Sequence, residues 1–116
     1  MREHVDYFDR LGISVTYYVG QNAQDNFDIL DLAVYDDLWF HVHGEPSCHV
    51  IAKLPGKLDR NDMRFVKTRG AELCRQYAKV STGGRSRKTI MCARVQDVKK
   101  CKRVGQVEVE RYSLLS

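Results

Sequence analysis

Short segments in which apolar and polar side chains alternate constrain the fold of this sequence more than any other feature. Residues 13–19 have apolar side chains at every second position, namely Ile13, Val15, Tyr17 and Val19. A period of two residues is typical of a β-strand with one buried face. Residues 38–43 and 49–54 repeat this pattern on either side of a turn that contains Gly44 and Pro46, which predicts a β-hairpin.

Two segments of helical periodicity alternate with these strands. Asn22 is a suitable N-cap for a short helix that extends to about residue 35. A longer helix is predicted over residues 61–79, where apolar side chains recur at helical spacing. Residues 88–95 and 106–112 then read as two further strands, the second with Val107 and Val109 inside.

These segments predict an α/β (α+β) fold with the order β-α-β-β-α-β-β. We expect a mixed sheet of about five strands with two main helices packed on it. The length of 116 residues suits one domain, residues 1–116, with a core over about residues 11–114.

Composition and cysteine spacing narrow the class of protein. The sequence holds no run of about 20 apolar residues that could cross a bilayer. Its first residues lack the hydrophobic region of a secretory signal, so we expect a cytoplasmic location. Cys48, Cys74, Cys92 and Cys101 have no C-x-x-C spacing, and we expect them to be reduced thiols.

Charge is distributed unevenly along the chain and favours an anionic partner for its second half. Residues 1–52 hold two basic and nine acidic side chains, whereas residues 53–116 hold 17 basic and six acidic ones. Within this half, a basic run of eight side chains contains a single acid, Asp97. Its members are Arg85, Arg87, Lys88, Arg94, Lys99, Lys100, Lys102 and Arg103. Such a field suits phosphate groups, although a solvated surface with both signs mixed in space remains an alternative.

Several short motifs carry a resemblance to a known family. The first half contains Tyr18-Val19-Gly20-Gln21-Asn22, then Asn26, then Asp37-Leu38-Trp39-Phe40-His41-Val42, then Pro46-Ser47-Cys48-His49-Val50. The second half adds Tyr77-Ala78-Lys79-Val80-Ser81 and Val104-Gly105-Gln106-Val107. In this order and spacing they resemble the NFACT-R domain, the RNA-binding module of ribosome-associated quality-control factors. The resemblance extends from about Leu11 onward, and the chain resembles an NFACT-R domain that stands alone.

The resemblance implies binding of tRNA or rRNA, linked to translation or ribosome-associated quality control, without catalysis and without a cofactor. Arg and Lys side chains would neutralise phosphates, and a polar set would supply selectivity. The residues that we expect to contact nucleic acid are Asn22, Asn26, Trp39, His41, His49, Lys53, Arg85, Arg87, Lys88, Lys99, Lys100, Lys102 and Arg103. We expect Trp39, His41 and His49 to share one surface, where bases stack and form hydrogen bonds.

Other functions stay open at this level. A DNA-binding module is an alternative, because phosphate contacts do not distinguish RNA from DNA. His41, His43, His49 and Cys48 could form the site of a small metal enzyme, but no carboxylate partner is evident and we expect no metal. Asp37 is expected to fix the turn that enters its strand. A protein-interaction adaptor that docks by the acidic first half is the remaining alternative.

Overall fold

Alternating apolar side chains build the central sheet of this protein, whose computed structural model describes residues 1–78 and 88–116. The sheet has six strands in the order β1-β2-β4-β3-β5-β8, and every pair of neighbours is antiparallel. The strands are β1 (Arg2–Phe8), β2 (Ile13–Val19), β3 (Leu38–Val42), β4 (Val50–Lys53), β5 (Ile90–Arg94) and β8 (Ser113–Leu115). The predicted hairpin is confirmed, because β3 and β4 pair with Leu38 opposite Ala52.

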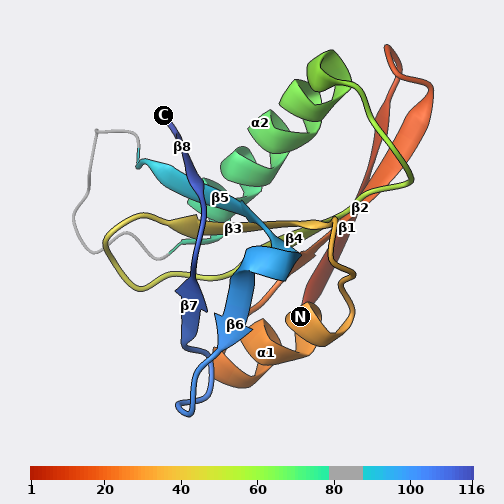
Figure 1. The fold of residues 1–116 in the computed structure, drawn as a ribbon. Helices are drawn as coiled ribbons and strands as arrows, with labels where there is room; N and C mark the ends of the chain where they lie inside the picture. Colours follow the sequence, from red (N-terminus) through yellow and green to blue (C-terminus); the bar gives the residue numbers. More distant parts are fainter. Residues whose placement is uncertain (79–87) are drawn as a thin grey trace.

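Helix α2 (Arg60–Tyr77) covers one face of the sheet (Figure 1). Asp59 caps its N-terminus by accepting a hydrogen bond from the backbone N–H of Asp62. Its apolar stripe, which includes Val66 and Leu73, packs on the inward side chains of the strands, such as Tyr17 and Phe40. The Tyr17 hydroxyl also donates to the carbonyl of Val66 across 2.9 Å. This face therefore holds the larger core.

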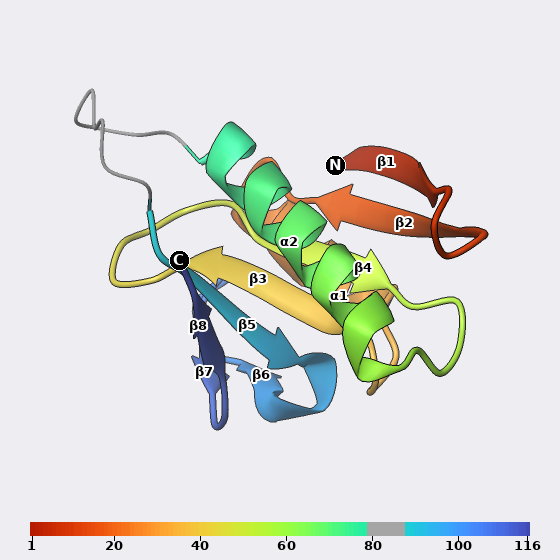
Figure 2. The ribbon, with the colours of Figure 1, turned by 90° about the horizontal axis from the view of Figure 1, so that it is seen from above.

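Helix α1 (Ala23–Asp31) lies on the opposite face of the sheet (Figure 1), and the view from above has α2 in front of the sheet (Figure 2). Its Ile29 and Leu30 pack against Trp39 and Ile51, side chains that point away from α2. The short strands β6 (Val98–Lys100) and β7 (Val107–Val109) pair with each other beside α1 and complete this second core. A single 3-10 turn, Val95–Asp97, connects β5 to β6.

The α+β architecture with two main helices agrees with the sequence-based prediction. The sheet has six strands where about five were expected, and it is antiparallel throughout and not mixed. Strand β1 was not predicted, because its polar composition hides the alternation that His4, Asp6 and Phe8 provide. The segment 106–112 forms only the short strand β7, and β8 completes the sheet edge beside β5. Helix α1 ends at Asp31, four residues before the predicted end.

The end of α1 has a local cause. The buried carboxylate of Asp37 accepts hydrogen bonds from the backbone N–H groups of Val34 and Leu54, which folds the chain back into β3. The prediction that Asp37 fixes this turn is confirmed. Among the helices of the described ranges, none is long and apolar enough to span a membrane.

Candidate nucleic-acid interface

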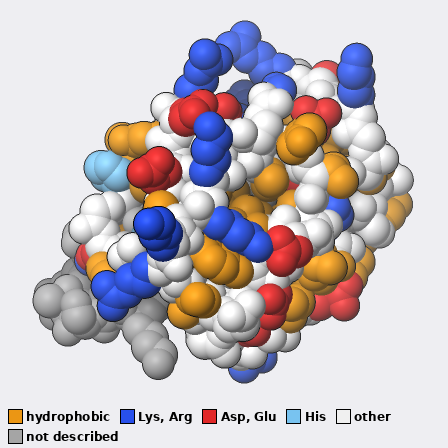
Figure 3. Space-filling model, turned by 60° about the horizontal axis from the view of Figure 1, so that its bottom comes forward, with side chains coloured by type: hydrophobic (Ala, Val, Ile, Leu, Met, Phe, Trp, Pro, Cys, Tyr) orange, Lys and Arg blue, Asp and Glu red, His pale blue; other side chains and the backbone are white. Residues whose placement is uncertain are grey.

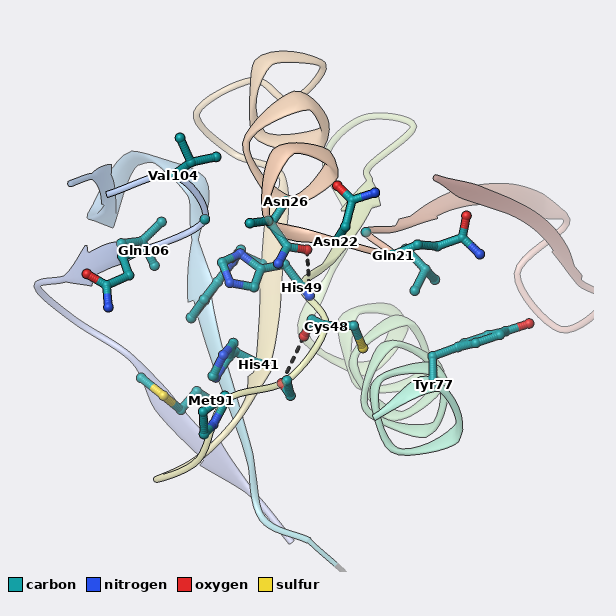
Figure 4. A pocket seen from close by; sticks show the side chains of 18 of the residues that line it. Gln21, Asn22, Asn26, His41, Cys48, His49, Tyr77, Met91, Val104 and Gln106 are labelled. Atoms are coloured by element: carbon teal, nitrogen blue, oxygen red, sulfur yellow. Dashed lines mark hydrogen bonds between the residues drawn. The ribbon is translucent and has the colours of Figure 1, made fainter. Parts of the chain in front are cut away.

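A wide groove of about 1370 Å³ opens on the α1 side of the sheet. Figure 4 shows Gln106 of the β6–β7 hairpin on one side of the groove and Gln21 on the other, with His41 and His49 between them. The predicted polar residues Asn22, Asn26, Trp39, His41 and His49 all line it. Residues from three separate motifs of the sequence therefore meet in one place.

Trp39, His41 and His49 form a cluster of rings at the floor of the groove. The indole Nε1–H of Trp39 donates to Nδ1 of His49 across 3.1 Å. The ring centroids of His41 and His49 are 5.0 Å apart with the planes nearly perpendicular. The ring of His41 stacks on that of Trp39, with the centroids 5.5 Å apart. The prediction that these three residues share one surface of the hairpin is confirmed.

The predicted role of Trp39 as an exposed stacking surface is wrong. Only 1% of Trp39 is accessible, because Ile29 and Leu30 of α1 pack on it and His41 covers it from the other direction. Its function in the fold is to hold His49 through the indole N–H and to support His41. A base that enters the groove would meet the two imidazoles and not the indole.

The hydrogen bonds of the two imidazoles fix which ring nitrogen carries a proton. Trp39 can only donate, so Nδ1 of neutral His49 accepts and its Nε2 is protonated. The carbonyl of Val42 can only accept, so Nδ1 of His41 donates across 2.6 Å and its Nε2 keeps a lone pair. Burial lowers the pKa of His49 to about 3 and also lowers the pKa of His41. Both rings are therefore neutral near pH 7.

The backbone of His49 is clamped between β2 and α1. Its N–H donates to Oδ1 of Asn26 across 3.2 Å, as Figure 4 shows, and its carbonyl accepts from the N–H of Gly20 across 2.9 Å. A Cβ atom at position 20 would lie 2.0 Å from Oδ1 of Asn26. Position 20 therefore requires glycine, and Asn26 acts by positioning His49.

Asn22 caps α1, as predicted, because its Oδ1 accepts from the backbone N–H of Asp25 across 2.9 Å. The carboxylate of Asp25 in turn accepts from the N–H of Gln21 and pairs with the N-terminal ammonium of Met1. Since a carboxylate already sits at this helix end, a phosphate is disfavoured here. The side-chain oxygen of Asn22 is likewise committed to the helix.

Much of the basic run is neutralised by acids that the fold brings from elsewhere in the chain. Lys88 pairs with Glu45 at 3.1 Å, Lys99 with Glu110 at 3.0 Å and Lys100 with Asp31 at 2.5 Å. Figure 3, which shows the lower side of Figure 1, has Lys and Arg side chains interspersed with Asp and Glu. The described part of the run therefore faces more acids in the fold than Asp97, the single acid within the run itself.

Two members of the run remain available. Lys102 and Arg103, at the tip of the β6–β7 hairpin, are exposed and make no ion pair within residues 1–78 and 88–116. Arg103 also lines the groove. Gly105 adopts φ 86° and passes so close to Ala23 that a Cβ would lie 2.9 Å from it, so the tip packs against the start of α1. Arg85 and Arg87 lie outside the described residues.

Lys53 does not belong to this interface. Its ammonium lies 2.6 Å from the carboxylate of Asp37 and donates to the carbonyl of Leu32. Asp37 is 1% exposed and needs this charge, because a buried carboxylate without a partner is costly. The predicted nucleic-acid contact of Lys53 is replaced by a structural ion pair that joins β4 to the turn before β3.

The groove also contains residues that the sequence did not indicate. Arg2 lines it from β1, with its guanidinium carbon 5.3 Å from the centroid of the Tyr77 ring. Met91 of β5 and Val104 of the hairpin add apolar lining. Arg2 and Met91 reach the groove only because β1 pairs with β2 and β5 pairs with β3, so no local pattern could have identified these two residues. Val104 belongs to one of the sequence motifs, but that motif did not show that its side chain lines a groove.

The histidines do not assemble into a metal site. Nδ1 of His49 is occupied by Trp39, and His43 instead lies beside Tyr112, with ring centroids 6.1 Å apart. Across the described part of the chain, no group of three or more His, Cys, Asp or Glu side chains is arranged to hold a metal ion.

The helices and the antiparallel sheet define an α+β domain, and comparison with solved structures finds the same fold elsewhere. The C-terminal part of the fibronectin/fibrinogen-binding protein from Streptococcus suis matches with a TM-score of 0.76 and 22% sequence identity. The match covers 97% of this chain and 43% of that chain, so this chain spans less than half of its solved neighbour. At this identity the likeness shows the fold. Comparison of the sequence with protein-family models and with curated proteins finds no match.

Proposed function

We propose that this chain is a non-catalytic RNA-binding domain that takes unpaired segments of a structured RNA, such as tRNA or rRNA, into the groove. The observation that carries the proposal is the meeting of Asn22, Asn26, Trp39, His41 and His49 in that groove. These residues come from the motifs that resemble the NFACT-R domain. On the basis of the same resemblance, we propose a role in translation or ribosome-associated quality control in the cytoplasm.

The charges around the groove support a nucleic-acid ligand. Lys102 and Arg103, which have no ion-pair partner among the described residues, stand at the hairpin tip within reach of a phosphate next to a base inside the groove. The floor is neutral and polar, which suits hydrogen bonding to a base. Duplex DNA, whose bases are paired, is a poorer fit to this arrangement than a single strand.

A hydrolytic function has less support, because the serine hydroxyl that lines the groove is not activated. Ser47 Oγ donates to the carbonyl of Cys48 and accepts from the N–H of Val42. Neither imidazole takes its proton, and a serine nucleophile requires such a base. We therefore propose binding without a chemical step.

A protein ligand is the second candidate. The solved neighbour is named as a protein that binds fibronectin or fibrinogen. Val104, which is 47% exposed beside the groove, offers an apolar contact for such a ligand. This candidate predicts an affinity that depends little on salt, in contrast to RNA binding.

A binding titration against tRNA, single-stranded RNA and duplex DNA, each at low and physiological salt, tests the proposal. We expect both RNAs to bind more tightly than the duplex and to lose affinity as salt rises. Fibronectin serves as the protein ligand in a parallel titration. Binding of fibronectin together with no detectable binding of either RNA would overturn the proposal.

A further inference from the structure

The floor of the groove presents one hydrogen-bond donor beside one acceptor, both uncharged. The donor is Nε2–H of His49 and the acceptor is Nε2 of His41, as their bonds to Trp39 and to the carbonyl of Val42 require. Within the described residues, these two atoms make no further hydrogen bond. In the described residues, every side-chain nitrogen or oxygen that lacks a hydrogen-bond partner is accessible to solvent. Both Nε2 atoms are therefore accessible from the groove that His41 and His49 line.

This arrangement is built and held rigid from several directions. His49 is 3% exposed, and its ring is held by Trp39 while its backbone is held by Asn26 and Gly20. Polar atoms fixed in this way cost little further entropy when a ligand arrives. A ligand that displaces water but lacks complementary groups would leave these two atoms without partners, which is unfavourable.

The chemistry of the floor favours a heterocyclic base over a phosphate. Both imidazoles are neutral, and the N-terminus of α1 beside the groove is already occupied by the carboxylate of Asp25. Met91, Val107 and Val109 add apolar lining to the same groove. A groove that combines apolar lining with a few fixed polar groups is typical of sites for flat organic ligands. The cationic tip with Arg103 stands at the side, where a phosphate would follow.

We infer that the groove holds one unpaired nucleobase of the bound RNA by its Watson–Crick edge, between His49 as donor and His41 as acceptor. This inference rests on the proposed RNA-binding function and names the part of the ligand that the site selects. Each Watson–Crick edge places a donor next to an acceptor, and exposed edges of unpaired bases are the groups that RNA-binding proteins read. The groove volume of about 1370 Å³ leaves room for the flanking nucleotides.

The test compares two probes on the whole chain: a fluorescent octamer of single-stranded RNA and an octamer with the same phosphates and sugars but no bases. We expect the RNA octamer to bind at least about tenfold more tightly, the effect of one good hydrogen-bonded contact. His41→Phe should remove most of this difference and leave the affinity for the abasic octamer unchanged. His43→Phe is the matched control, because His43 lies on the same hairpin beside Tyr112 and does not line the groove.

A second variant and a second measurement guard against misfolding. His49→Gln keeps an N–H near the position of Nε2 and should retain part of the difference, with folding checked by thermal melting. In the unaltered protein, adding uridine should shift the ¹⁵N resonances of His41 Nε2 and His49 Nε2, and those of His43 should stay in place.

The outcomes separate the inference from the function on which it rests. Equal affinity for the RNA and abasic octamers overturns the base site and leaves RNA binding intact. A difference that survives unchanged in His41→Phe also overturns the base site. Absence of binding to either octamer and to tRNA contradicts the proposed function, and the inference falls with it.

Discussion

Trp39 and His49, ten residues apart on the two arms of the β3–β4 hairpin, are joined by a hydrogen bond of 3.1 Å from indole Nε1 to imidazole Nδ1. This bond is buried, and it determines both the tautomer and the orientation of His49. Trp39, which the sequence predicted to stack on a ligand, therefore positions His49, the residue that faces the groove.

The burial of His49 makes the stability of the fold sensitive to mild acid. The pKa of His49 is about 3 in the folded protein, against 6.5 for an exposed imidazole. Between these values the unfolded chain binds more protons, so the free energy of unfolding decreases as the pH falls from 6.5. The slope approaches about 1.4 kcal/mol per pH unit, and His41 contributes in the same direction. Urea unfolding at several pH values between 7 and about 5 measures this slope of the unfolding free energy against pH.

His49→Gln is the control for this prediction, since glutamine does not titrate. Its stability should vary less with pH than that of the unaltered protein over the same interval. Identical slopes for the two proteins would show that His49 is not buried as a neutral ring.

Gly20 and Asn26 should be energetically coupled. A methyl group at position 20 would collide with Oδ1 of Asn26, so Gly20→Ala should destabilise the protein by about 1–3 kcal/mol. In an Asn26→Ala background the collision is relieved, and the same substitution should cost at least about 0.5 kcal/mol less. Chemical denaturation of the two single variants and the double variant gives the coupling. Strict additivity would contradict the close approach of these two residues.

Asp37 is expected to contribute strongly to stability and little to binding. Asp37→Ala removes the acceptor of two backbone N–H groups and the partner of Lys53, so we expect a loss of about 3 kcal/mol. The neighbouring Asp36 is the matched control, because its carboxylate is 82% exposed and its nearest charge, on Arg94, is 3.9 Å away. Asp36→Ala should change stability by less than about 0.5 kcal/mol. Equal losses in the two variants would be inconsistent with the buried ion pair.

Cys48 should be the more reactive member of the Cys48–Cys74 pair. A hydrogen bond with Cys74 lowers the pKa of Cys48, whereas the hydrogen bond with Cys48 and, second, burial raise the pKa of Cys74. Burial also raises the pKa of Cys92 to about 11. Because the thiolate is the nucleophile, iodoacetamide should alkylate Cys48 before Cys74 and Cys92, as peptide mass spectrometry can follow.

Cys48 also lines the groove, which adds a ligand-dependent part to this prediction. Bound RNA should slow the alkylation of Cys48. Faster modification of Cys74 than of Cys48 would contradict the assigned environments, and an unchanged rate with saturating RNA would place the RNA elsewhere.

The strands and helices with strong periodicity could be predicted from the sequence, and so could the gathering of His41 and His49. Alternation over residues 13–19 and 38–43 fixes which side chains share a face. The polar strand β1 and the short strands β6 and β8 lack this signal, because their pairing is decided by tertiary contacts.

The charge environment could not be predicted, because ion pairs join residues far apart in sequence. Lys100 and Asp31 are separated by 69 residues, and Lys53 and Asp37 meet only when β4 pairs with β3. The burial of Trp39 depends in the same way on the docking of α1. Composition identified an excess of positive charge, and the fold decides which of these charges a ligand can reach.

RNA binding beside the hairpin tip is tested most directly by a salt titration of three proteins. The affinity for single-stranded RNA is titrated against salt for the unaltered protein, for Lys102→Glu/Arg103→Glu, and for Lys57→Glu/Arg64→Glu as a control with the same change of net charge. Lys57 and Arg64 are exposed and do not line the groove. We expect the hairpin variant to bind more weakly and its salt slope to flatten by about 0.7 for each phosphate that the protein no longer neutralises. The control should keep most of its affinity and of its salt slope. A folded hairpin variant with unchanged affinity and slope, or a larger decrease in the control, would contradict the groove as the binding site and point to the exposed face of α2.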